Sequence, residues 1–229
     1  MAERKHFFDD PKAALAEYHK KGYYIEPGML TPEDCADVIA YAREKSVSNT
    51  TKTQIPLLIH YSQHPLLVRI AQQLVGGEVE GLHVEYCFEE PGNKAIEPHQ
   101  DSHSLQVPSG AFFTVTIALE DTERESGATV IWEGSHDEGV LAPVEEGGKK
   151  TVKQKMEECK EVACSLKKGD VLFHHGDVVN AKDKNTSKKF APIILSAYIR
   201  KGTHYRSGSY FAKNKKPIGI VQDSYSPVG

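Results

Sequence analysis

Apolar residues in the first third of the chain recur every three or four positions, which is the period of an amphipathic helix. Asp10-Pro11 and Thr31-Pro32 each place a proline after an N-cap residue, so two helices are expected to begin there. A third is expected to run from Pro65 to the Gly76-Gly77 pair. The pattern predicts a helical part over about residues 8–77. Its packing stripes are Leu15 with Tyr18, then Cys35, Val38, Ile39 and Ala42, then Leu66, Leu67, Ile70 and Leu74.

After Gly77 the apolar residues fall into short β-rich runs separated by Gly, Pro, Asn and Asp. This texture is typical of a sandwich or barrel of antiparallel strands. The charged stretch from Pro143 to Lys160 is expected to be a surface insertion. The predicted strands are 79–88, 111–119, 128–132, 161–165, 171–174 and 190–200.

A length of 229 residues is enough for one sizeable core, so a single domain over 1–229 is expected. Its parts are the helical region, a β core over about 78–205 and a C-terminal tail over 206–229. The net charge of −4 gives no basic face for nucleic acid. The charged N-terminus is followed by no apolar run of signal-peptide or spanning length, so no membrane association and a cytoplasmic location are expected.

The sharpest chemical signal is His99-Gln100-Asp101, which follows a turn-rich segment. In an extended chain His99 and Asp101 point to the same side, so an imidazole and a carboxylate can converge on one metal ion. An H-x-D triplet is a weak motif by itself, because a three-ligand site needs a third donor from elsewhere.

Four blocks of this sequence resemble the phytanoyl-CoA dioxygenase family, and together they cover about residues 13–205. Residues 97–101, Glu-Pro-His-Gln-Asp, are similar to the family's H-x-D segment. Residues 116–121 and 126–136 resemble its strand, acidic turn and "PGSH" passage, and residues 168–198 resemble the strand pair that closes its iron site. Residues 23–30 resemble its opening strand and helix entry.

The resemblance implies a mainly β fold, a double-stranded β-helix (jelly roll, cupin-like) with N-terminal helices packed on the barrel. It also implies a non-haem Fe(II) site in which 2-oxoglutarate and O2 are used to oxidise a small organic molecule. Neutral imidazole and carboxylate with open coordination positions suit Fe(II).

Three positions depart from the family pattern. With Gly169-Asp170 and Asn185 held in register, the third-ligand histidine is replaced by Asn180, whose neutral amide binds Fe(II) weakly. The arginine that anchors 2-oxoglutarate is replaced by Ala191, and a small hydroxyl residue by Lys182. Use of 2-oxoglutarate is therefore doubtful.

Other residues are candidates for the missing roles. A repositioned His175 is the alternative third ligand to Asn180. His174 and His175 end the preceding strand, and five extended residues span more than ~15 Å, so neither is expected to replace the lost ligand unless the loop is rearranged. Both are expected to be turn histidines or to lie behind the ligands. For orientation of the co-substrate the candidates are Gln100, Tyr86 and Lys189.

Two functions follow from these residues. One is an iron-dependent oxygenase with a modified site. The other is a catalytically inactive relative that acts as a binding module or as the supporting subunit of an active oxygenase, in a homo- or hetero-oligomer. A cupin-like isomerase or hydrolase is less supported, because no second acid–base pair is marked.

Overall fold

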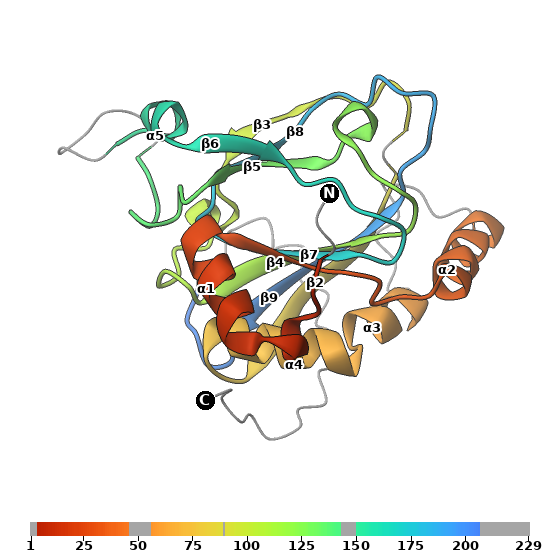
Figure 1. Ribbon diagram of the computed structural model, residues 1–229, viewed down its shortest axis with the longest axis horizontal. Coiled ribbons are helices and arrows are strands. Elements are labelled where there is room, and N and C mark those ends of the chain that lie inside the picture. Colours follow the sequence, from red (N-terminus) through yellow and green to blue (C-terminus); the bar gives the residue numbers. More distant parts are fainter. Residues whose placement is uncertain (1–3, 46–55, 89, 143–149, 207–229) are drawn as a thin grey trace.

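Two antiparallel sheets stack face to face in the computed structural model of the chain, which describes residues 4–45, 56–88, 90–142 and 150–206 (Figure 1). One sheet has the strand order β1-β7-β4-β9-β2 and the other β3-β8-β5-β6. This arrangement confirms the predicted double-stranded β-helix. The strands are β1 (Tyr23–Glu26), β2 (Val79–Cys87), β3 (Ile96–His99), β4 (Phe112–Ala118), β5 (Thr129–Glu133), β6 (Lys160–Ala163), β7 (Val171–His175), β8 (Asn180–Lys182) and β9 (Ile193–Arg200).

Helices cover the outer face of the five-stranded sheet, where their apolar stripes and the outward residues of the strands form the largest buried cluster (Figure 1). The two predicted N-caps are confirmed, since the side chains of Asp10 and Thr31 accept hydrogen bonds from the amides of Ala13 and Asp34. The helices are α1 (Pro11–Lys21), α2 (Pro32–Glu44), α3 (Pro56–Ser62), α4 (Pro65–Val75) and α5 (Val152–Glu158), with short 3-10 turns at Phe7–Asp9, Asp101–Ser104 and Arg124–Ser126.

Helix α1 ends at Gly22, which has a φ of +84°. A Cβ atom there would lie 2.7 Å from Nδ1 of His136 and 2.7 Å from a methyl carbon of Val178. Both the left-handed backbone and the lack of space therefore require glycine at the point where the helix turns into β1.

The predicted strands agree with the observed ones to within a few residues. Three short strands, β1, β3 and β8, were absent from the list derived from periodicity. The last part of the expected surface insertion over 143–160 forms α5, whose Lys155 is only 5% exposed. Residues 143–149 and the tail over 207–229 lie outside the described residues.

Strand register brings the site residues together. His99 on β3 is the cross-strand partner of Asn180 on β8, and Thr114 on β4 is the partner of His174 on β7. Side chains alternate along a strand, so His174 and His175 point to opposite faces of their sheet. None of the described helices has the length and apolar character needed to cross a membrane.

Candidate metal centre

His99 and Asp101 converge at the end of β3. Nε2 of His99 lies 3.1 Å from Oδ1 of Asp101, which begins the 3-10 turn after the strand. Two ligands held about 2.1 Å from one ion at a right angle are separated by about 3 Å. The predicted pair therefore has the spacing of two neighbouring metal ligands.

The ring of His99 is oriented by its second nitrogen. Nδ1 lies 2.9 Å from the backbone oxygen of Glu97, to which it donates. A metal-binding histidine is oriented in this way, because the bonded Nδ1–H leaves Nε2 free to act as the ligand. Nε2 faces a carboxylate oxygen, and two acceptors this close require a proton or a cation between them. Without a metal the proton is favoured, so the hydrogen bond to Asp101 raises the pKa of His99.

His174 holds the other side of the Asp101 carboxylate. Its Nε2 donates to Oδ2 of Asp101 over 3.0 Å, and the hydroxyl of Thr114 donates to the same oxygen over 2.6 Å. Burial alone would raise the pKa of Asp101, but the hydrogen bonds and charges of His174 and His99 dominate and hold it well below its usual range. Asp101 is an anion at neutral pH.

His174 lies behind the ligand pair, as a histidine that contacts a ligand and not the metal position itself. The contact is made across the barrel interior, from β7 to the turn after β3. Nδ1 of His174 is buried and has no hydrogen-bond partner among the described residues. Pairing of His174 with Thr114 in the sheet could not be read from local sequence.

His175, the alternative third ligand, points away from this centre. Its ring lies 4.8 Å from that of His136 and 6.1 Å from that of Tyr18, beneath α1. Nδ1 of His175 accepts a hydrogen bond from the amide of Asp177, and burial lowers its pKa to about 4. A neutral, packed imidazole in this position is structural.

Asn180 is directly opposite His99 in the β3–β8 pair, so their side chains are close enough to contact each other. Its amide nitrogen makes only long contacts, 3.5 Å to the backbone oxygen of His99 and 3.4 Å to that of Val178. Its amide oxygen accepts no bond from a described residue. Asn180 can therefore turn an oxygen toward an ion held by His99 and Asp101.

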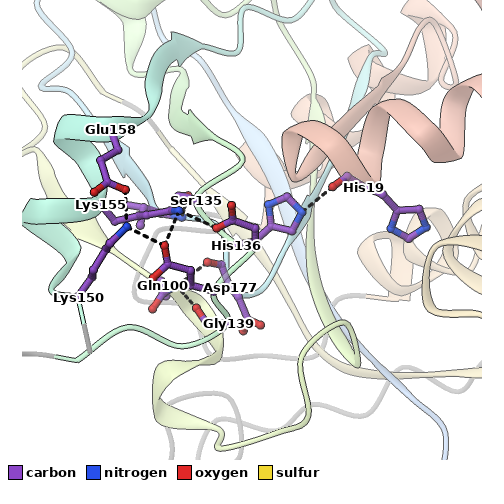
Figure 2. A network of polar contacts seen from close by, with 12 residues as sticks. His19, Gln100, Ser135, His136, Gly139, Lys150, Lys155, Glu158 and Asp177 are labelled. Carbon is purple, nitrogen blue, oxygen red and sulfur yellow. Dashed lines mark hydrogen bonds and ion pairs between the residues drawn. The ribbon is translucent and has the colours of Figure 1, made fainter. Parts of the chain in front are cut away.

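The side chain of Gln100 ties three backbone segments together. Its amide nitrogen donates to the backbone oxygens of Gly139 and Asp177, at 2.9 and 2.5 Å, and its oxygen accepts from the amide of Leu141 at 2.8 Å (Figure 2). Both ends of the amide are thus occupied by the backbone. This geometry fits a positioning role beside the ligand pair better than the expected contact with co-substrate.

A cavity of about 700 Å³ opens at the ligand pair. Lys182 lines it, and of the described lining residues it is the one lysine or arginine. Thr116 also lines the cavity, and its buried hydroxyl has no hydrogen-bond partner among the described residues. Ala191 is fully buried. The remaining walls are largely apolar and include Ile96, Leu141, Ala142, Val152 and Leu195.

Tyr86 and Lys189, the other residues expected to orient a co-substrate, line a separate cavity of about 590 Å³. Tyr86 belongs to the cluster between the sheet and the helices, whereas its neighbours Glu85 and Cys87 line the first cavity. Side chains alternate between the two faces of β2, so Tyr86 points to the opposite side from Glu85 and Cys87. The sequence contained this signal, because residues 85 and 87 share one face and residue 86 has the other.

The donor set fits iron through two strong ligands and one weak one. Among the described residues, no three His, Cys, Asp or Glu side chains are grouped so that they could hold a metal ion by themselves. Asp101 stands between the two imidazoles, so His174 contacts the carboxylate oxygen that does not face His99. A third donor of another type is needed, and the amide oxygen of Asn180 supplies one.

The chain is similar in sequence to curated proteins that carry the phytanoyl-CoA dioxygenase name. The chain is 29% identical over 142 residues to the phytanoyl-CoA dioxygenase domain-containing protein 1 of Danio rerio, which covers 58% of this chain and 49% of that one. It is 24% identical over 184 residues to the peroxisomal phytanoyl-CoA dioxygenase of Bos taurus, with 73% and 54% covered. The chain thus spans about half the length of these curated relatives.

Solved structures resemble the fold. The alpha ketoglutarate dependent epimerase SnoN from nogalamycin biosynthesis, in its complex with Fe3+, alpha ketoglutarate and nogalamycin RO, has a TM-score of 0.75 at 21% identity over 95% of both chains. EctD from S. alaskensis with 2-oxoglutarate and 5-hydroxyectoine has a TM-score of 0.70 at 14% identity, with 82% of this chain and 76% of that one covered. The family model described as phytanoyl-CoA dioxygenase (PhyH) matches residues 10–193, most of the chain, and the protein therefore belongs to the phytanoyl-CoA dioxygenase family.

Proposed function

We propose that this protein is a non-haem iron oxygenase that oxidises a small organic substrate with Fe(II), O2 and a 2-oxo acid. The observation that carries the proposal is the His99–Asp101 pair, oriented by Glu97, His174 and Thr114 and open to a 700 Å³ cavity. Preorganised ligands with an open cavity are what a metal-dependent oxygenase needs.

Fe(II) would be held by Nε2 of His99, by Oδ1 of Asp101 and, weakly, by the amide oxygen of Asn180. When bound, iron of this type offers open positions for a co-substrate and dioxygen. His174 would act through Asp101, because its bond to Oδ2 fixes the carboxylate and keeps it ionised. His175 has no part in the centre.

A carboxylate co-substrate needs a cation, and Ala191 cannot supply one. We assign this role to Lys182, which follows Asn180 by two residues on the same face of β8 and lines the same cavity. The hydroxyl of Thr116 is a second donor in that cavity. An ammonium group is a point charge and does not reproduce the two-pronged clamp of an arginine, so we expect 2-oxoglutarate to bind weakly. Neighbours solved with alpha ketoglutarate or 2-oxoglutarate support the choice of co-substrate.

The substrate is expected to be small and mainly apolar. Aliphatic side chains, among them Leu141, Val152 and Leu195, form much of the cavity wall.

Anaerobic calorimetric titration of Fe(II) into the metal-free protein tests the proposal. We expect micromolar binding that tightens when 2-oxoglutarate is present. Binding should be lost in Asp101→Ala and kept in Asp37→Ala, a control in which an exposed carboxylate of α2 is removed.

Absent binding, or equal binding by both variants, would refute the oxygenase proposal. It would favour the supporting-subunit function, to which the neutral amide at Asn180 and the apolar Ala191 are suited. A pull-down with a related oxygenase would then be the next measurement.

A further inference from the structure

We propose that the second cavity is a binding site for a small amphiphilic anion, in which a phosphate or carboxylate is attached to an aromatic ring or acyl chain. This cavity of about 590 Å³ lies where the end of β2, helix α2 and the loop before β9 meet. The inference does not depend on iron or on the proposed oxygenase reaction.

Three cations surround this cavity. Arg43 comes from α2, and Lys188 and Lys189 come from the loop before β9. All three are exposed, and none forms an ion pair with a described residue. Long basic side chains that converge from two separate segments make a site for an anion.

Two carboxylates also line the cavity, but each is already paired. Glu120 lies 3.0 Å from the ammonium nitrogen of Lys168, and Asp121 lies 2.8 Å from that of Lys167. Asp121 also accepts a hydrogen bond from the amide of Lys168. The negative charges of these two acids are therefore balanced by Lys168 and Lys167. The three other cations make the net charge of the site positive.

Tyr86 lines the cavity and carries a buried hydroxyl. The residue is only 4% exposed, and its hydroxyl has no hydrogen-bond partner among the described residues. Burial raises the pKa of Tyr86 to about 12, against the opposing effect of Arg43, so the phenol keeps its proton at neutral pH. A buried hydroxyl without a partner costs free energy, which an anionic oxygen accepting from it would recover.

The apolar part of the ligand is indicated by the aromatic residues. Phe190 is 57% exposed at the rim, although large apolar side chains are usually buried. Phe88 packs edge-on against Tyr86, with ring centroids 4.6 Å apart. Ile39 and Pro192 complete the apolar wall. A plain inorganic anion would leave these surfaces in water.

This site and the metal centre use opposite faces of one strand. Glu85 and Cys87 of β2 line the metal cavity, whereas Tyr86 lines the second one. A ligand in one cavity is thus separated from the other by the sheet itself.

Calorimetric titration of the metal-free full chain with phenyl phosphate tests the inference. Lys188→Glu/Lys189→Glu should weaken binding by about tenfold or more, the value of at least one charge-assisted hydrogen bond. Tyr86→Phe should weaken it by about threefold to tenfold, since only a hydroxyl is removed. The matched control is Lys12→Glu/Lys153→Glu, which makes the same change in net charge at exposed lysines of α1 and α5.

Two further titrations test whether binding is independent of the metal cavity, and whether both the ring and the phosphate of the ligand contribute to affinity. Binding should persist in Lys182→Ala, whose side chain lines the other cavity. Inorganic phosphate and benzyl alcohol should each bind much more weakly than phenyl phosphate. Equal loss in the control double variant, loss in Lys182→Ala, or equal affinity for inorganic phosphate would overturn the inference.

Discussion

Replacement of His174 by leucine tests whether this residue acts on the metal centre through Asp101. The imidazole is 3% exposed and donates to an Asp101 carboxylate that is 10% exposed. A hydrogen bond to a charged group contributes about 1.5–3 kcal/mol, and Asp101 keeps two other partners in the variant. We therefore expect the free energy of unfolding of the metal-free protein to fall by about 2 kcal/mol.

The same variant should bind Fe(II) about 10- to 100-fold more weakly, because groups that orient a ligand typically have this effect on metal affinity. Denaturant unfolding of the metal-free protein and anaerobic titration of Fe(II) are the two measurements. His174→Gln, which offers an amide donor to Asp101, should recover part of both losses.

Two results would refute this reasoning. Unchanged stability and unchanged affinity would mean that the contact with Asp101 contributes nothing. Complete loss of iron binding, as expected for Asp101→Ala, would mean that His174 is itself a ligand.

Three other predictions follow from the described contacts. Gln100→Leu should lower the free energy of unfolding by about 3 kcal/mol, because three hydrogen bonds to the backbone are lost at about 1 kcal/mol each. An unchanged denaturant midpoint of unfolding would contradict this prediction. Burial of His175 and partial burial of His136 lower their pKa values, so both are neutral in the folded state and protonate more readily when unfolded. Their contribution to stability should be complete above pH 6.5 and should fall between pH 6.5 and about 4, by about 3 kcal/mol from His175 alone. His175→Gln should flatten that fall, and an unchanged pH profile of this variant would contradict the prediction. Lys182→Ala should abolish the tightening of Fe(II) binding by 2-oxoglutarate while leaving binding of Fe(II) alone intact, and persistence of the tightening would exclude Lys182 as its cause.

Alternation along the extended backbone from His99 through Gln100 was enough to predict that His99 and Asp101 lie on the same side. His99 and Asp101 lie two residues apart, and the structure places them 3.1 Å from each other. Gln100, between them, was expected to orient the co-substrate. Its side chain faces the other way and donates to the backbone oxygens of Gly139 and Asp177.

Contacts between distant segments could not be predicted in this way. His174 reaches Asp101 only because β7 pairs with β4 and faces the turn after β3, a relation between residues 73 positions apart. Strands β3 and β8 are four and three residues long, too short for a periodic pattern, and Pro98 interrupts the first. Their pairing is nevertheless what sets Asn180 against His99.

The three departures from the family pattern are best understood together. An anionic co-substrate entering this cavity meets the carboxylate of Asp101, held ionised by its neighbours, and Glu85 on the wall. The family's arginine position holds Ala191 in this chain, and Lys182 is the one lysine or arginine among the described residues that line the cavity. The cation stands two residues after Asn180 on the same face of a strand, so the weak ligand and the replacement charge are supplied by one segment. The position of Lys182 therefore favours a cavity that still binds a carboxylate.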